Sequence, residues 1–234
     1  MTSDALVKTA IFCDFDGTVS RRDIGYHLFR HFSGGRNEEL VPLWKERRIT
    51  TRECLRREVE MVEAREEDIY RFLDGFELSP GFADFVARCR HRRVDLTILS
   101  DGMDFYIDYV LSRHGLGYLP VVANHGFFEE GRLAISFPYG NASCERCGSC
   151  KGERIREYRR RCGEAIRAVF VGDGYSDICA VEEADLVFAK KDLERYCRGH
   201  DIPFTQYGDF TDIIQHLIGL GILADSTGHA TDGD

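Results

Sequence analysis

Short apolar runs and longer amphipathic stretches alternate through most of this 234-residue chain. Residues 7–13 (VKTAIFC) form an apolar run that stops at a turn containing Asp and Gly, a pattern typical of a buried strand. The later runs that we expect to form strands are 94–100, 119–124, 165–174, 185–190 and 202–207, with a hairpin over 125–137 that turns at Glu130 and Gly131. Helical periodicity lies between them, at 81–92, 103–115, 151–162 and 175–184. This alternation predicts an α/β fold, a doubly wound parallel sheet of Rossmann-like type.

Residues 20–79 interrupt that alternation. They are charged and periodic with almost no strand-like run, and they predict three or four amphipathic helices, over 21–32, 37–47, 51–63 and 66–76. We therefore expect a helical cap (20–79) inserted into a core made of 1–19 and 80–223. The last residues, 224–234, lack apolar periodicity and predict a disordered tail.

The composition is that of a globular protein, with 43% hydrophobic and 30% charged residues. A formal net charge of -9 argues against sequence-independent binding of nucleic acid, which requires a basic surface, but it permits a small anionic ligand in a locally basic cleft. No apolar run approaches the roughly 20 residues of a membrane span, and the start of the chain lacks a signal-peptide core. We therefore expect no membrane partner and a cytoplasmic location. Monomer and homodimer both fit the sequence.

Polar residues gather directly after three of the predicted strands. In an open α/β sheet, ligands bind at the carboxyl ends of the strands, so these positions share one edge. They are Asp14, Asp16, Gly17 and Thr18 after the first strand, Ser100, Asp101 and Gly102 after the second, and Asp173, Gly174, Ser176 and Asp177 after a later one. Lys151 opens the helix before the last of these strands. Taken singly, each piece fits a turn, a helix cap or a surface lysine, but their occurrence together predicts a reaction site.

These residue types suit phosphoryl transfer. Enzymes accelerate the hydrolysis of phosphate monoesters by up to about 10²¹-fold, which no single group can supply. A nucleophilic carboxylate divides the reaction through an aspartyl-phosphate, and a second carboxylate protonates the leaving oxygen and then activates water. Clustered carboxylates repel one another by roughly 4 kcal/mol per pair at about 4 Å and an effective dielectric of about 20. The cluster therefore also predicts a hard cation, Mg²⁺, held by oxygen ligands.

The run DFDGT, a strand ending in serine, a later lysine and the run GDGYSD resemble the four motifs of the haloacid dehalogenase superfamily of phosphatases, over about residues 8–215. The helical block resembles the cap of its phosphoserine-phosphatase-like branch. The resemblance implies that Asp14 is the nucleophile and that Asp16 is the general acid and base.

The same resemblance implies the ligands of the metal and of the phosphoryl group. Mg²⁺ is expected at Asp14, the Asp16 carbonyl and Asp173, with Asp177 in support. The phosphoryl group is expected to contact Ser100 and Lys151, with Gly102 allowing a close approach of the backbone.

The cap resembles phosphoserine phosphatases in one place and departs from them in others. The run CLRREV resembles their SLRKRV, which places Arg56 at the position of their carboxylate-binding arginine. Asp23 stands where those enzymes usually have glutamate, and Asp101 stands where they have glycine. A shorter carboxylate and an added one argue against free phosphoserine as the substrate.

A second branch is similar between the second and third motifs. VVANHGFF, SDGMDF and a cysteine-rich insert before Lys151 resemble the methionine-salvage phosphatases that act on 2-hydroxy-3-keto-5-methylthiopentenyl-1-phosphate. Phosphoethanolamine/phosphocholine phosphatases also carry cysteines at that place. We therefore expect hydrolysis of a small phosphorylated metabolite of the salvage type, with phosphoserine and phosphoethanolamine or phosphocholine as alternatives. The expected substrate contacts beyond the phosphate are Asp23, Arg56, Asp101 and His125.

Three of the nine cysteines are spaced as a unit, at Cys144, Cys147 and Cys150. Structural packing, a zinc site and redox regulation are the three interpretations. Zinc requires four ligands, and His125 or Cys162 are candidates for the fourth. A non-catalytic phosphometabolite-binding or redox-sensing protein is the alternative of another class, although binding alone does not require the second carboxylate, Asp16.

Overall fold

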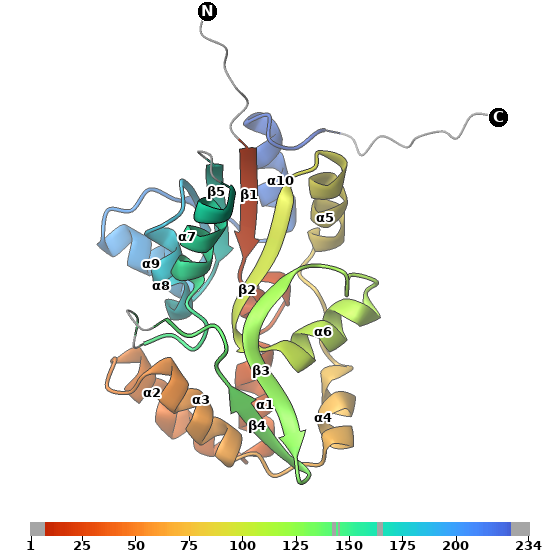
Figure 1. Cartoon of the computed structure of the whole chain (residues 1–234), viewed down its shortest axis with the longest axis vertical. Coiled ribbons are helices and arrows are strands. Elements are labelled where there is room, and N and C mark those ends of the chain that lie inside the picture. The colour runs from red at the N-terminus through yellow and green to blue at the C-terminus, as the bar shows by residue number, and fades with distance from the viewer. Residues whose placement is uncertain (1–7, 142–143, 145, 163–165, 226–234) are drawn as a thin grey trace, which may run out of the picture.

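The computed structural model describes residues 8–141, 144, 146–162 and 166–225. Seven strands form one sheet in the order β4-β3-β2-β1-β5-β6-β7, and all neighbours are parallel except the β3–β4 pair (Figure 1). The strands are β1 (Lys8–Cys13), β2 (Asp95–Met103), β3 (Val121–Glu129), β4 (Arg132–Ser136), β5 (Ile166–Gly172), β6 (Leu186–Ala189) and β7 (Thr205–Gln206). This is the predicted doubly wound sheet, with the antiparallel hairpin added at one edge.

Helices cover both faces of the sheet because its central strands are apolar on both sides. On β1, Ile11 and Cys13 pack into one buried cluster, and Ala10 and Phe12 pack into a second cluster on the opposite face. The first cluster includes α5 (Phe82–His91), α6 (Asp104–Arg113) and α10 (Phe210–Gly219), and the second includes α7 (Lys151–Cys162), α8 (Ile178–Val181) and α9 (Lys191–Gly199). In the described part of the chain, no helix has the length and apolar character needed to cross a membrane.

Four helices lie beyond the carboxyl end of β1 (Figure 1). They are α1 (Ile24–Phe32), α2 (Leu40–Lys45), α3 (Thr51–Glu60) and α4 (Glu66–Leu73). A bridge between Ser20 and Leu78 brings the two ends of this insertion together. The division into a cap (20–79) and a core (1–19 and 80–223) stays a prediction, and most of the predicted disordered tail (224–234) lies outside the described residues.

Several elements differ from their predicted extents. β2 continues through Ser100–Met103, with a register irregularity against β3 after Leu99. The runs 119–124 and 125–137 are not separate units, because β3 passes from the core sheet directly into the hairpin. The helix predicted over 175–184 is reduced to Ile178–Val181 after a short turn. The loop before it is shaped by side-chain hydrogen bonds, which periodicity does not reveal.

Candidate active site

The carboxyl edge of the sheet faces the α1–α3 side of the insertion across a cleft of about 640 Å³. The ends of β1, β2 and β5 supply carboxylates to its lining. The cap supplies mainly apolar and aromatic side chains, Tyr26, Phe29, Val41, Trp44 and Leu55. Ligand pockets commonly combine such an apolar wall with a few convergent polar groups.

Lys151 and two aspartates form a buried ion-pair cluster behind the lining of this cleft, which the cluster reaches through Asp14. Lys151 begins α7, and its fully buried Nζ lies 2.5 Å from Asp14 Oδ1 and 2.6 Å from Asp177 Oδ1. Asp177 Oδ2 accepts the backbone N–H groups of Asp173 and Gly174, at 2.9 and 3.0 Å, and thereby fixes the loop after β5. The fold therefore brings the predicted nucleophile, lysine and last motif to one place.

The charges of this cluster fit a divalent cation. Carboxylate oxygens of Asp14, Asp173 and Asp177 lie within 4.8 Å of one another. Burial, together with the neighbouring carboxylates, raises the pKa of Asp14 despite the opposing charge of Lys151, and burial also raises the pKa of Asp173. The raised pKa values mean that burial and the neighbouring carboxylates disfavour the ionised forms more than the paired lysines favour them, and a bound cation would offset this cost. Because all three donors are carboxylate oxygens, this group suits a hard cation such as Mg²⁺.

Burial lowers the pKa of the Lys151 ammonium, but the charges of Asp14 and Asp177 outweigh burial and raise it. The lysine therefore stays charged at neutral pH. A fixed positive charge beside Asp14 is suited to binding the oxygens of a phosphoryl group attached there.

Asp16 lies across the turn from Asp14 and has a different environment. Its Oδ1 accepts the backbone N–H of Ile24 at 2.8 Å, and its Oδ2 accepts the hydroxyl of Tyr106 at 2.6 Å. Burial and then the charge of Asp23 raise the pKa of Asp16 to about 7, while the Tyr106 hydrogen bond lowers it. A carboxyl that titrates near neutral pH can serve as both general acid and general base.

Ser100 and Gly102 close the opposite side of the cleft floor at the end of β2. The buried Ser100 Oγ accepts the backbone N–H of Gly102 at 2.9 Å. A Cβ on Gly102 would overlap the Tyr106 hydroxyl and would lie 2.5 Å from Asp16 Oδ2. Glycine is therefore required where the backbone approaches these two groups so closely.

Asp23 and Asp101, two predicted substrate contacts, line the cleft but also carry structural hydrogen bonds. Asp23 is the N-cap of α1, and its side chain accepts the backbone N–H of Tyr26 at 2.8 Å. Asp101 Oδ1 accepts the backbone N–H of Ser149 at 2.6 Å, which joins β2 to the cysteine-rich insert. Burial raises the pKa of Asp101 to about 6.

Arg56 and His125, the other two predicted contacts, lie away from the cleft lining. Arg56 is exposed, and its guanidinium lies over the Phe137 ring, 5.2 Å from the centroid. Helix geometry explains this position, because residues two apart on a helix are about 200° apart around the axis, and Cys54 and Glu58 are the α3 residues that face inward. His125 is exposed on β3 and pairs through Nδ1 with Asp104, at 2.8 Å.

Glu58, Tyr106 and Lys191 line the cleft, although the motifs did not point to them. Glu58 is 6% exposed, and burial raises its pKa to about 7. Lys191 follows β6, and its Nζ lies 2.7 Å from Asp173 Oδ2. Lys191 is predictable because it follows a strand, β6, at the same edge of the sheet. Glu58 is predictable because it lies four residues after Cys54 and so shares its face of α3. Tyr106 lies inside α6, where no motif marks it.

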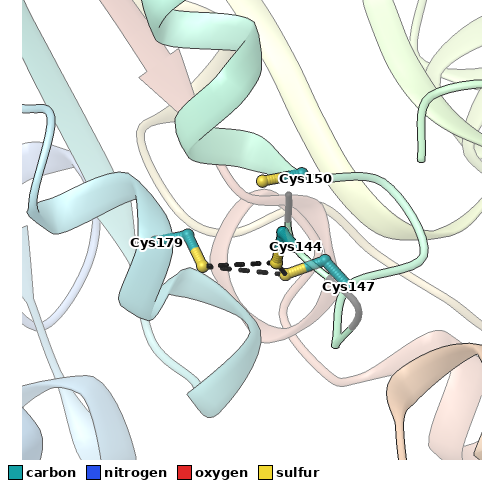
Figure 2. Close-up of side chains that lie close together, drawn as sticks. All are labelled: Cys144, Cys147, Cys150 and Cys179. Carbon is teal, nitrogen blue, oxygen red and sulfur yellow. Dashed lines mark hydrogen bonds between the residues drawn. The ribbon is translucent and has the colours of Figure 1, made fainter. Parts of the chain in front are cut away.

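The cysteine trio has a fourth neighbour that its spacing does not reveal. The sulfur atoms of Cys144, Cys147, Cys150 and Cys179 lie within 4.8 Å of one another (Figure 2). Neither of the two predicted partners belongs to this group of described residues: His125 pairs with Asp104, and Cys162 is the last residue of α7.

Comparison of the sequence with known proteins gives a consistent result. A family model described as "Putative Phosphatase" matches residues 9–198. The 2-hydroxy-3-keto-5-methylthiopentenyl-1-phosphate phosphatase of Brevibacillus brevis is 30% identical over 216 residues, which cover 90% of this chain and 95% of that protein. The protein with the same name in Bacillus pumilus is 29% identical, over 88% of this chain and 89% of its own.

Solved structures share the fold at low sequence identity. A phosphoserine phosphatase carrying an analogue of its phospho-aspartyl intermediate superposes with a TM-score of 0.71 at 18% identity, over 90% of this chain and 99% of its own. A hydrolase of the HAD (haloacid dehalogenase) family from Salmonella enterica serovar Typhi superposes with a TM-score of 0.73 at 19% identity, over 94% and 73%. These likenesses confirm the predicted fold class.

Proposed function

The chain belongs to the phosphatase family whose model spans residues 9–198, and from this premise we propose that it hydrolyses a small phosphomonoester through an aspartyl-phosphate on Asp14. The observation that carries the proposal is the buried cluster in which Lys151 Nζ contacts both Asp177 and Asp14, and Asp14 lines the cleft. A binding protein gains nothing from burying a carboxylate where an anionic phosphate must approach. A nucleophilic carboxylate, in contrast, must lie next to the phosphorus atom that it attacks.

The side chains then divide the reaction among them. Asp14 attacks phosphorus, and Lys151 and Ser100 hold the phosphoryl oxygens. Asp16, with its pKa near 7, donates a proton to the leaving oxygen and takes one from the water that hydrolyses the acyl phosphate. Asp14, Asp173 and the Asp16 carbonyl would hold Mg²⁺, which would neutralise charge on the phosphate when bound.

The cap wall of the cleft supports a substrate whose other end is not anionic. Glu58 is buried there, and the basic residues of the lining are paired, Lys45 and Arg195 with Asp192, and Lys191 with Asp173. A substrate carboxylate would meet Glu58 without a free cation among the described lining residues. Free phosphoserine is therefore the least suitable of the three candidates.

The apolar side chains around Glu58 support a neutral thioether tail. Phe29, Val41, Trp44 and Leu55 contribute this surface, and the relatives from Brevibacillus and Bacillus are named for a methylthio-substituted phosphate. We assign a 2-hydroxy-3-keto-5-methylthiopentenyl-1-phosphate-like compound as the leading substrate. Glu58 itself favours a second candidate, phosphoethanolamine or phosphocholine, because a carboxylate in a cleft that is also lined by aromatic rings suits a cationic head group.

The two candidates separate in one kinetic experiment. We would measure kcat/KM with Mg²⁺ for the methylthio-ketopentenyl phosphate, phosphoethanolamine, phosphocholine and phosphoserine, in wild type and in Glu58→Gln. A salvage-type enzyme prefers the first compound and keeps that activity in Glu58→Gln. A choline or ethanolamine phosphatase prefers the cationic substrates and loses them selectively in the variant.

The reaction itself is tested with Asp14→Asn, using Asp108→Asn on the exposed side of α6 as the matched control. We expect Asp14→Asn and addition of a chelator each to abolish turnover, and Asp108→Asn to retain it. Equal activity of Asp14→Asn and wild type after purification would overturn the assignment of the nucleophile. The described residues of one chain line the whole cleft, and this supports a monomer or a homodimer. A small metabolite as the substrate supports a cytoplasmic location.

A further inference from the structure

Four cysteine side chains converge beside the proposed catalytic lysine. Cys144, Cys147 and Cys150 come from the insert before α7 (Figure 2). Cys179 comes from α8, which follows α7 and β5 in the sequence. The Cys147 and Cys179 sulfurs are 3.7 Å apart, those of Cys144 and Cys147 are 3.3 Å apart, and those of Cys144 and Cys179 are 4.0 Å apart. Two segments remote in sequence thus deliver sulfur atoms to one point.

These three distances fit one face of a tetrahedron around a metal ion, and the Cys150 sulfur lies within 4.8 Å of all three as the fourth corner. A zinc–sulfur bond of about 2.3 Å gives sulfur–sulfur edges of about 3.8 Å in a tetrahedral site. We propose that Cys144, Cys147, Cys150 and Cys179 bind one structural zinc ion as a four-thiolate site. Four protein ligands leave no open position, so the ion holds the fold and does not take part in hydrolysis.

Apolar packing does not account for this group. Cys13, Cys89 and Cys197 belong to the two hydrophobic clusters on the faces of the sheet. Among the described residues, the four converging cysteines belong to neither cluster. Thiols that fill a core have apolar neighbours, whereas these thiols have one another.

The surroundings of Cys150 suit a thiolate. Cys150 directly precedes α7, a helix of 12 residues, and the partial positive charge of a helix N-terminus stabilises an anionic sulfur. The side-chain amide of Asn141 donates a weak hydrogen bond to the Cys150 sulfur, at 4.0 Å. Such donors around a metal site orient its ligands and increase its affinity.

The zinc ion would join the two segments that carry the catalytic cluster. Cys150 is followed at once by Lys151, and Cys179 lies two residues after Asp177. The two helices already approach closely, because a Cβ on Gly152 would overlap the backbone carbonyl of Cys179. A bond from each segment to the same ion fixes the separation between Lys151 and Asp177.

Metal content tests the proposal without any measurement of phosphatase activity. The chain is purified under reducing conditions without chelator, and zinc, iron and protein are quantified. We expect about one zinc ion per chain. Replacement of zinc by Co²⁺ should produce the intense visible absorption and the sulfur-to-cobalt charge-transfer bands of a tetrahedral thiolate site.

Variants place the ion at the four cysteines. Cys179→Val should lose the zinc, whereas Cys179→His, which keeps four ligands, should retain it. Cys162→Ser is the matched control on α7 and should retain zinc. Asp173→Asn should also retain it, which excludes zinc bound at the carboxylate cluster.

Three results would overturn the proposal. The first is wild-type protein with neither zinc nor, after cobalt treatment, a thiolate spectrum. The second is iron in place of zinc. The third is a Cys144–Cys147 disulfide found by mass spectrometry in protein purified without reductant, with zinc content unchanged in Cys179→Val. None of these results bears on Asp14, so failure of the zinc site and failure of the proposed hydrolysis are distinguishable.

Discussion

Replacing Glu58 by glutamine tests whether the cap buries an acid at the cleft. Glu58 is 6% exposed, and its Oε1 accepts a long hydrogen bond, 3.4 Å, from the Asn37 side-chain amide, with the Cys54 thiol as a second side-chain partner of the carboxyl. Burial raises its pKa from the ordinary 4.5 to about 7. A carboxylic acid with a raised pKa in the folded state binds its proton more tightly there than in the unfolded chain. Its contribution to the free energy of unfolding is therefore complete below the unfolded pKa of 4.5, falls as the pH rises above it, and is lost once the pH has passed the folded pKa of about 7.

The size of this loss follows from the two pKa values. At about 1.36 kcal/mol per pH unit, the difference between 4.5 and about 7 corresponds to about 3.4 kcal/mol. Between pH 5 and pH 8.5, the linkage relation gives about 2.5 kcal/mol of that loss. Glutamine is neutral throughout, so the free energy of unfolding of Glu58→Gln minus that of wild type should rise by about 2.5 kcal/mol over this interval. Titrations common to both proteins cancel in this difference.

The assay is urea unfolding at several pH values, followed by fluorescence of Trp44, which is the single tryptophan and lines the same cleft. Far-UV circular dichroism checks that cap and core unfold together. Glu60→Gln, on the exposed side of α3, is the matched control, and its difference from wild type should not change with pH. A pH-independent difference for Glu58→Gln, or one that falls with rising pH, would refute the reasoning.

Three further substitutions test the proposed active site. Lys151→Met leaves the two buried carboxylates that pair with this lysine without a positive partner. In urea titrations with chelator, it should lower the free energy of unfolding by about 3–5 kcal/mol at pH 8 and by less at pH 5. An equal loss at both pH values would contradict this. Gly102→Ala drives a methyl group into the Tyr106 hydroxyl and should reduce kcat about tenfold or more, since misplacement of reacting groups by about 1 Å can cost about 100-fold. Gly219→Ala is the control and should leave kcat unchanged, because its added methyl group meets nothing within 4 Å. Tyr106→Phe removes a hydrogen bond that lowers the pKa of Asp16. The alkaline limb of the plot of kcat/KM against pH should therefore shift to a pH about one unit higher. A limb at the same pH as in wild type would exclude Asp16 as the general acid.

Residues that follow strands were predictable because the sheet itself places them. Asp14, Ser100 and Asp173 reach one edge whatever the surrounding loops do, since parallel strands end on the same side. The identity of Lys151 as their partner also followed, because α7 begins where the sequence pattern places its first residue. The fold class and the family, both confirmed, rest on the same strand-end motifs.

Residues on helices and inserts were less predictable because their direction depends on packing. Arg56 was chosen from a motif, but the inward face of α3 is set by Cys54 and Glu58, so the arginine points outward. Cys179 had no spacing relation to the cysteine trio, because the contact between α7 and α8 is tertiary. The strand–hairpin continuity of β3 likewise depends on the neighbouring β4 and not on its own alternation.

The insert before α7 contacts the cap as well as the core, and this has a mechanical consequence. On the cap side, the backbone N–H of Thr51 donates to the Arg146 carbonyl at 2.8 Å, and Arg52 Nε donates to the Cys147 carbonyl at 2.9 Å. On the core side, the Ser149 N–H is held by the buried Asp101. A rotation of α3 about the cleft must therefore either break the two cap contacts or pull on the segment that ends at Lys151. Because Lys151 is fully buried between carboxylates, the cap contacts are the weaker points and should open first. Opening of these two cap contacts would leave Lys151 in place beside Asp14.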